Sequence, residues 1–234
     1  MIDRLIASQG EDRILLLSGG PKSHLATRSM FAKGMKKRLV ITQPNIDSQK
    51  THSPLSGETI ISKNKKPMQG ALQDFTDQGW KVTNILNSMN LESMLRALKP
   101  HTPNGSVWAG ALSYDLVQWT QPISLQYPPA EGEILAILWL VDSWDESEVI
   151  IPEIANTVRV EGEKSSHSDD EHAEIVKKIK HSITAGELYQ LNFGRTWTGP
   201  LEEDPSAIFH RLAMNNPAPF SGYIEAADLG IALA

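Results

Sequence analysis

The longest uninterrupted apolar run in this sequence, Ile134–Val141, has only eight residues. A membrane-spanning helix needs roughly eighteen or more, whereas a run of this length suits one buried β-strand. Shorter apolar runs, each bounded by turn residues or a polar stretch, occur at Arg13–Leu17 and Arg38–Thr42. The chain is therefore expected to fold around buried strands and to make no membrane contact.

The composition excludes several chemistries. The 234 residues include no cysteine, which removes disulfides, thiolate nucleophiles and Cys-held metal clusters. A net charge of −6 argues against a wide nucleic-acid interface, and 21% charged residues are too few for a disordered chain. Residues 1–13 carry charges that interrupt each short apolar stretch. No targeting segment is predicted, and a cytoplasmic location is expected.

Four helices are predicted. Asn84–Leu98 has apolar residues mostly three and four apart, and Pro100 follows it. Ser168 or Asp169 caps a second helix that ends at Gly186, with an acidic first turn, lysines later and a core-facing stripe. A third begins at Asp204-Pro205, and a short fourth follows a strand. The core-facing residues are Ile175, Ile179 and Ile183 in the second helix and Ile208, Phe209 and Leu212 in the third; the fourth helix is Tyr114–Trp119.

Further strands are predicted between these helices and near the end of the sequence. Residues 142–147 read as a hairpin connection, and the charged stretch 159–168 reads as a linker between two halves. The fold class is α+β, a sheet-rich scaffold with covering helices. The additional strands are Glu58–Ser62, the segment that begins at Val107, Val149–Ile151, Glu187–Thr198, Phe220–Ala226 and Leu229–Ala234.

Two carboxamides, Gln190 and Asn192, lie two residues apart in the predicted strand 187–198. A strand would present both to one side, where they could orient a carboxylate, a hydroxyl or water. The alternative is a solvated sheet face, and spacing alone favours that alternative.

Three other motifs have simpler explanations. Residues 18–23 (SGGPKS) lack the spacing of a phosphate-binding loop, and Pro21 has no N–H to donate, so only a small polar pocket remains open there. His167 and His172 flank acidic residues that helix capping already explains, so no metal ligand is predicted. Asn104-Gly105-Ser106 reads as a turn. Trp108, Trp139 and Trp197 are expected in the core.

Several segments together resemble the chorismate-utilising family of anthranilate synthase and aminodeoxychorismate synthase large subunits. Residues 186–193 (GELYQLNF) and 216–221 (NPAPFS) match two of its motifs at the expected separation. Residues 110–116 (GALSYDL) look like its Gly-Tyr-Asp segment, although Ser113 stands where the family often has glycine. Residues 15–18 (LLLS) look like its N-terminal strand. The resemblance implies an N-terminal region over 1–160 and the start of a chorismate-binding domain over 169–234.

The resemblance also implies roles for individual residues. Gln190 takes a position that faces chorismate, where water-adding relatives carry lysine, so glutamine indicates the ammonia-using branch. Asn192 resembles aminodeoxychorismate synthase more than anthranilate synthase, which tends to have valine there. Five residues of this chain resemble the elements that form a buried tryptophan pocket in the family: Ser18, Arg28, Pro219, Phe220 and Ser221.

By the same resemblance, the family's Ser-Pro-Glu motif, its catalytic acid and its Mg²⁺-binding glutamates would follow Ala234. The chain is therefore expected to be an inactive N-terminal portion of an aminodeoxychorismate synthase large subunit. The complete enzyme would use Mg²⁺ and a glutamine amidotransferase partner to aminate chorismate for the folate pathway. Anthranilate synthase component I and a non-enzymatic tryptophan-binding module are the alternatives.

Overall fold

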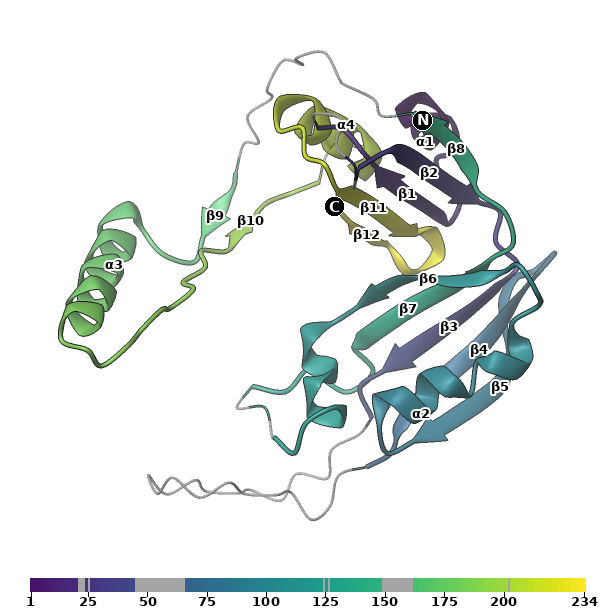
Figure 1. Ribbon diagram of the computed structural model, residues 1–234, viewed down its shortest axis with the longest axis horizontal. Helices are drawn as coiled ribbons and strands as arrows, with labels where there is room; N and C mark the ends of the chain where they lie inside the picture. The colour runs from purple at the N-terminus through teal and green to yellow at the C-terminus, as the bar shows by residue number, and fades with distance from the viewer. Residues whose placement is uncertain are drawn as a thin grey trace.

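The computed structural model describes residues 1–20, 24, 26–44, 66–123, 125, 127–148, 162–201 and 203–234. The expected α+β class is confirmed, with antiparallel sheets and helices on their outer faces (Figure 1). No helix in the described ranges is long and apolar enough to cross a membrane. The predicted strands at 58–62 and 149–151 lie outside these ranges.

Sheet A has five strands in the order β12-β11-β1-β2-β8, and every neighbouring pair is antiparallel. It joins both ends of the sequence, because β1 pairs with β11 with Leu17 opposite Ser221. The predicted 13–17 strand and the two strands joined near Asp228 are confirmed. The strands are β1 (Arg13–Leu17), β2 (Arg28–Lys33), β8 (Asp145–Glu148), β11 (Ser221–Ala226) and β12 (Ile231–Leu233).

Sheet B also has five antiparallel strands, in the order β5-β4-β3-β7-β6. The predicted 134–141 strand is confirmed as β7, seven of whose eight residues are buried. No side chain fits at Gly110 on β6, because a Cβ there would lie 2.0 Å from the Ile137 carbonyl oxygen. The strands are β3 (Lys37–Thr42), β4 (Met68–Thr76), β5 (Gly79–Ser88), β6 (Val107–Leu112) and β7 (Ile134–Val141).

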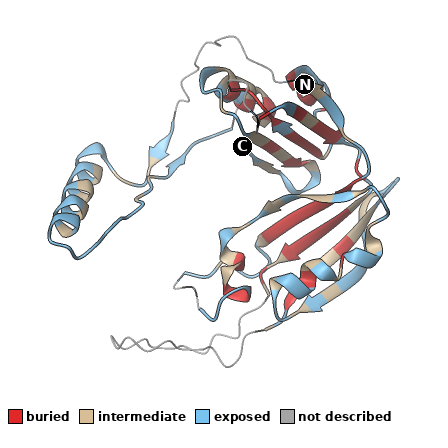
Figure 2. Ribbon diagram, viewed as in Figure 1, coloured by how far each residue is buried: buried red, intermediate tan, exposed pale blue. Residues whose placement is uncertain are grey.

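Three apolar clusters hold four layers together (Figures 1 and 2). Helices α1 (Ile2–Ala7) and α4 (Pro205–Asn215) cover the outer face of sheet A, where Leu15 and Leu17 point. Ile14 points the other way, into the core shared with Trp139 of sheet B. Helix α2 (Leu91–Arg96) and the 3-10 helix η2 (Tyr114–Trp119) cover sheet B from outside. Burial of both faces explains the continuous apolar runs.

The predicted helix over residues 84–98 is largely wrong. Residues 79–88 form β5, and only Leu91–Arg96 are helical, capped by Asn90. A tight turn at Gly79, whose φ is +93°, folds β5 back onto β4, so strand pairing overrides the helical spacing of its apolar residues. The hairpin connection predicted at 142–147 is also wrong, because residues 145–147 belong to strand β8 (Asp145–Glu148), which lies in a different sheet from β7.

Helix α3 (Asp169–Thr184) and the two-stranded ribbon of β9 (Lys164–Ser165) and β10 (Trp197–Thr198) form an arm that extends away from both sheets (Figure 1). The predicted Ser168 cap is confirmed as a capping box with Glu171. The predicted core stripe is not buried, since none of the α3 residues is. The predicted strand 187–198 is reduced to its last two residues. Trp197 is 53% exposed, so its expected core position is wrong.

A charged cluster centred on the buried Arg38 guanidinium ties sheet A to sheet B. Arg38 on β3 makes two hydrogen bonds of 2.7 and 2.6 Å to Asp228 and a third of 3.1 Å to Asp12, just before β1. Asp12 also accepts hydrogen bonds from Trp139 Nε1 at 2.7 Å and from the Ala227 N–H at 3.0 Å. The Arg38 guanidinium lies 4.3 Å from the Trp80 ring centre. The two buried charges, on Arg38 and Asp12, are therefore both paired, as burial requires.

A second buried pair lies one residue along the chain. Arg13, fully buried, bonds the Glu225 carboxylate and the Leu5 carbonyl, and its Nη2 atom lies 3.8 Å from Asp204 at the start of α4. Tyr223 donates its hydroxyl to the same Glu225 carboxylate. Burial raises the pKa of Tyr223, and this hydrogen bond raises it further. The pair therefore joins α1 and α4 to sheet A.

Asp12 is expected to contribute less stability as the pH rises. Burial raises its pKa above the usual 3.8, although hydrogen bonds and Arg38 oppose the shift. The folded protein then holds this proton more tightly than the unfolded chain. Its contribution to the unfolding free energy is full below the unfolded pKa and falls through the folded one. Urea unfolding from about pH 3.5 to about pH 6 should show the wild type losing stability relative to Asp12→Asn.

Asp77→Asn provides the control, because Asp77 is exposed in the β4–β5 turn. That variant should track the wild type across the series. A wild type that gains stability over Asp12→Asn with rising pH would contradict the prediction, since ion pairing would then outweigh burial.

Candidate functional site

The first candidate site is a junction at one end of sheet A. Ser18, which follows β1, is buried, and its hydroxyl donates a 2.9 Å hydrogen bond to the Arg28 carbonyl oxygen. The Ser18 N–H donates to Ser29 Oγ at 3.1 Å. The hydroxyl oxygen keeps acceptor capacity for a ligand. The β1–β2 connection therefore fixes the position of this serine.

The segment before β11 closes over the same end. The Gly19 N–H donates a 3.1 Å hydrogen bond to the Ala218 carbonyl, and a Cβ on Gly20 would lie 2.7 Å from the Pro219 nitrogen. Phe220 follows and is 68% exposed. Four of the predicted tryptophan-pocket residues are thus brought to one end of the sheet: Ser18, Pro219, Phe220 and Ser221.

Arg28 joins this junction only through its backbone carbonyl. Its guanidinium forms a 2.6 Å ion pair with Glu146 on β8, and its side chain is 59% exposed. An exposed pair of this kind adds little stability, so the guanidinium can exchange partners at small cost. The backbone carbonyl of Arg28 therefore contacts Ser18, whereas its guanidinium lies at the edge strand β8.

A pocket of about 260 Å³ lies between α4 and the start of β11. Phe220 and Ser221 line it, whereas Ser18, Arg28 and Pro219 do not. The helix side of this pocket was not predicted. Asn216 was expected to be the first residue of the 216–221 motif, and the start of that motif at the end of α4 is the signal that could have indicated the helix side. The other lining residues are Phe209, Leu212, Ala213, Asn216, Ala218, Gly222 and Ala234.

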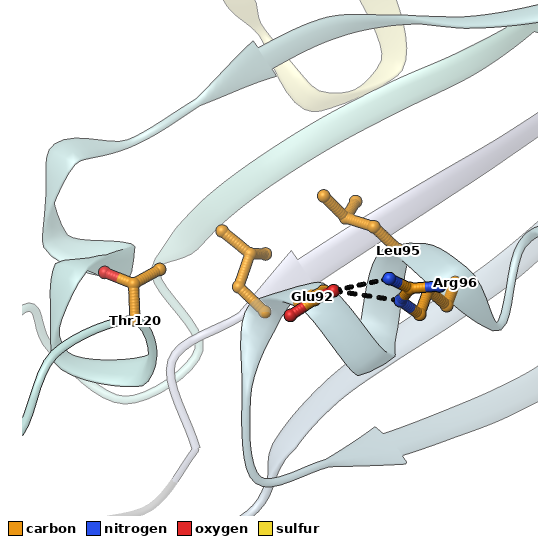
Figure 3. Close-up of a pocket in the computed structure, with 5 residues that line it drawn as sticks. Glu92, Leu95, Arg96 and Thr120 are labelled. Atoms are coloured by element: carbon orange, nitrogen blue, oxygen red, sulfur yellow. Dashed lines mark hydrogen bonds and ion pairs between the residues drawn. The ribbon is translucent and has the colours of Figure 1, made fainter.

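A second hollow, of about 540 Å³, is wide and open and lies between α2 and η2 (Figure 3). Leu91 and Leu95 line it, with Thr120 on the opposite side. The Glu92–Arg96 ion pair, one turn apart on α2, also borders it. None of the residues singled out from the sequence lies here, and the wall offers leucines and a self-paired charge.

Gln190 and Asn192 lie on the arm, in the irregular segment between α3 and β10. Both are exposed, and neither lines either of the two hollows described above. Their neighbour Phe193 packs against two histidine rings, with centroids 5.4 Å away for His167 and 5.5 Å for His172. These histidines therefore pack locally at the base of α3. The described residues hold no group of three or more His, Asp or Glu side chains that could bind a metal ion.

Comparison with known proteins gives the family. The model of the chorismate binding enzyme family matches residues 56–232, about three quarters of the chain. The chain belongs to the chorismate binding enzyme family. The matched range includes β11 of sheet A, all of α3 and most of sheet B. No solved structure matches.

Individual relatives match over short segments. An anthranilate synthase of Azospirillum brasilense is 29% identical over 59 residues, 25% of this chain and 8% of the relative. Component 1 of an aminodeoxychorismate synthase is 31% identical over 64 residues in Bacillus subtilis and 29% over 70 residues in Streptomyces lividans. These matches cover 27% and 30% of this chain and 14% of each relative. The matches thus span a small fraction of each relative.

Gly20→Ala should destabilise the junction. The added Cβ would meet backbone atoms of residues 218 and 219, which cannot rotate away. We expect a loss of roughly 1–3 kcal/mol in the unfolding free energy, measured by urea denaturation. Gly194→Ala is the matched control, because nothing lies within 4 Å of its Cβ position. Equal stability of the two variants would show that the chain does not close over Gly20.

Proposed function

We propose that the chain is part of the large subunit of an aminodeoxychorismate synthase. This enzyme aminates chorismate to 4-amino-4-deoxychorismate, with ammonia supplied by a glutamine amidotransferase subunit. The observation that carries the proposal is the family match, which includes the Tyr189–Asn192 segment. Relatives named as component 1 of this synthase support it.

Asn192 favours this synthase over anthranilate synthase, by the resemblance described above. Both names occur among the relatives, so anthranilate synthase component I is the second candidate within the family. The two reactions share chorismate and ammonia and differ in the product. Product identity therefore separates them.

Gln190 and Asn192 are proposed to bind chorismate. Each carboxamide offers two N–H donors and one acceptor oxygen, a set that suits the carboxylates and hydroxyl of this substrate. Both are exposed on the arm, so nothing in the described residues blocks a ligand from reaching them. We propose that polypeptide beyond Ala234 forms the opposite wall of the site.

The enzymes of this family use Mg²⁺, but the described residues of this chain do not fit a site for it. Their acidic side chains are dispersed among ion pairs and helix caps. No three acidic or histidine side chains of the described residues lie close enough together to bind a metal ion. The role proposed for this chain is therefore binding and orientation of the substrate by neutral amides.

The chain alone should not aminate chorismate. Joined at Ala234 to the C-terminal part of the Bacillus subtilis component 1, it should yield 4-amino-4-deoxychorismate with Mg²⁺ and ammonium. Liquid chromatography with mass detection would identify the product. Anthranilate as the product would establish the second candidate. A folded fusion that leaves chorismate untouched would refute both.

Within that fusion, Gln190→Lys should lower ammonia-dependent product formation by about tenfold or more, because a cation replaces a neutral donor and acceptor. Gln78→Lys is the control, since Gln78 is equally exposed but lies in the β4–β5 turn. Equal rates for the two variants would remove Gln190 from the site.

A binding function without chemistry is the third candidate, and it rests on a different observation. The structure brings Ser18, Pro219, Phe220 and Ser221 to one end of sheet A, beside a pocket of about 260 Å³. Apolar walls with a few polar groups suit an aromatic amino acid such as tryptophan.

Isothermal titration calorimetry with tryptophan tests this candidate. Saturable heat with one site per chain is expected. Ser221→Ala, at a serine that lines the pocket, should weaken binding roughly fivefold, the loss of one hydrogen bond worth about 1 kcal/mol. Thr120→Ala, which alters the hollow beside α2, should leave the affinity unchanged. Absence of heat would remove tryptophan as a ligand of this chain.

A further inference from the structure

We propose that Asn104 is a site of spontaneous deamidation, in which the backbone nitrogen of Gly105 attacks the Asn104 side chain. Water is the only other reactant, so the modification needs no enzyme. The proposal is independent of the chorismate function and rests on the turn that leads into β6.

The turn comprises residues 103–106. The Ser106 N–H donates a 3.2 Å hydrogen bond to the Pro103 carbonyl, and Gly105 has a φ of +89°. A glycine with positive φ at the third position is typical of a type II turn. The closing hydrogen bond uses the Ser106 N–H, and the described structure records no hydrogen bond for the Gly105 N–H. The attacking nitrogen is therefore available.

The Asn104 side chain is available as well. Residues 103–105 are exposed, and no hydrogen bond of Asn104 to another described residue is recorded. Nothing lies within 4 Å of the position that a Gly105 Cβ would take. The side chain and the next nitrogen can therefore approach without displacing a neighbour, at the cost of opening one long turn hydrogen bond.

None of the other asparagines in the described ranges precedes a glycine, and several are also held in place. The Asn90 side chain is held by the Ser93 N–H as the cap of α2, and Asn216 precedes Pro217, which has no N–H. The Asn84 side chain accepts from the Ile85 N–H, the group that would have to attack it. Asn87 lies in the β4–β5 ladder opposite Gln69. The same chain thus supplies matched internal controls.

The chemistry balances with water alone. The Gly105 nitrogen loses its proton and bonds to Asn104 Cγ, the Cγ–Nδ2 bond breaks, and ammonia leaves with the proton. The resulting five-membered imide is opened by one water molecule at either carbonyl. One product is aspartate, and the other is isoaspartate, in which the main chain runs through Cγ. Both carry a carboxylate that is ionised at neutral pH.

The modification alters charge and geometry at the start of β6. Ser106 Oγ donates a 2.7 Å hydrogen bond to Asp142, and the next residue, Val107, pairs with Val141. A new carboxylate at residue 104 adds negative charge to the same turn that binds Asp142 through Ser106. Isoaspartate also lengthens the turn by one methylene group, which shifts the backbone that enters the β6–β7 ladder.

The experiment is ageing of the intact chain at about pH 8 and 37 °C, followed by peptide mass spectrometry with electron-transfer fragmentation. The peptide that contains Asn104 should gain about 1 Da, at a rate at least about tenfold above the peptides of Asn87, Asn90 and Asn216. Fragment ions should show both aspartate and isoaspartate. Asn104→Gln should abolish the gain at this position.

A synthetic peptide of residues 100–108 sets the unfolded reference. Conversion of Asn104 in the folded chain at a rate within about tenfold of the peptide supports the proposal. A folded chain that stays unmodified while the peptide converts would overturn it, because the turn would then hold the side chain away from Gly105. Equal rates at all the asparagines would also overturn it.

Discussion

The pairing of the buried Arg38 guanidinium with Asp12 and Asp228 is the constraint on which the two-sheet arrangement depends. Arg38 belongs to sheet B, whereas both acids flank strands of sheet A. Asp12 and Arg13 are consecutive in an extended segment, so their side chains point to opposite faces. Asp12 meets Arg38 between the sheets, and Arg13 meets Glu225 beneath α1 and α4. Two adjacent residues thus fix both faces of sheet A.

Much of the scaffold could be predicted from sequence because its signals are local. The run Ile134–Val141, the Ser168 cap and the Asp204-Pro205 helix start each carry their own explanation, and the structure confirms all three. Residues 84–98 misled because β5 carries apolar residues at helical spacing, and only the hairpin with β4 determines their conformation. The crossing from β7 to β8 was missed for the same reason, since sheet membership is decided by distant partners.

The same distinction between local signals and distant strand pairing applies to the candidate site. Ser18 and the residues 219–221 could be selected by resemblance, and strand pairing between β1 and β11 then brings them together. The ion pair of Arg28 with Glu146 could not be predicted, because it depends on β8 joining the edge of sheet A. Gln190 and Asn192 were expected on a strand, but no ladder partner for that segment lies in the described part of the chain. Their role in binding chorismate stays a prediction.

The pairing of β1 with β11 also has a consequence for biosynthesis. Arg13 and Glu225 are neighbours in sheet A but 212 positions apart in sequence, whereas every strand of sheet B lies between residues 37 and 141. Because the chain leaves the ribosome N-terminus first, all strands of sheet B can pair before β11, the partner of β1, has been translated. During that interval α4 and β11 do not yet cover Leu15 and Leu17 of β1. Strand β11 thus completes the sheet that β1 begins.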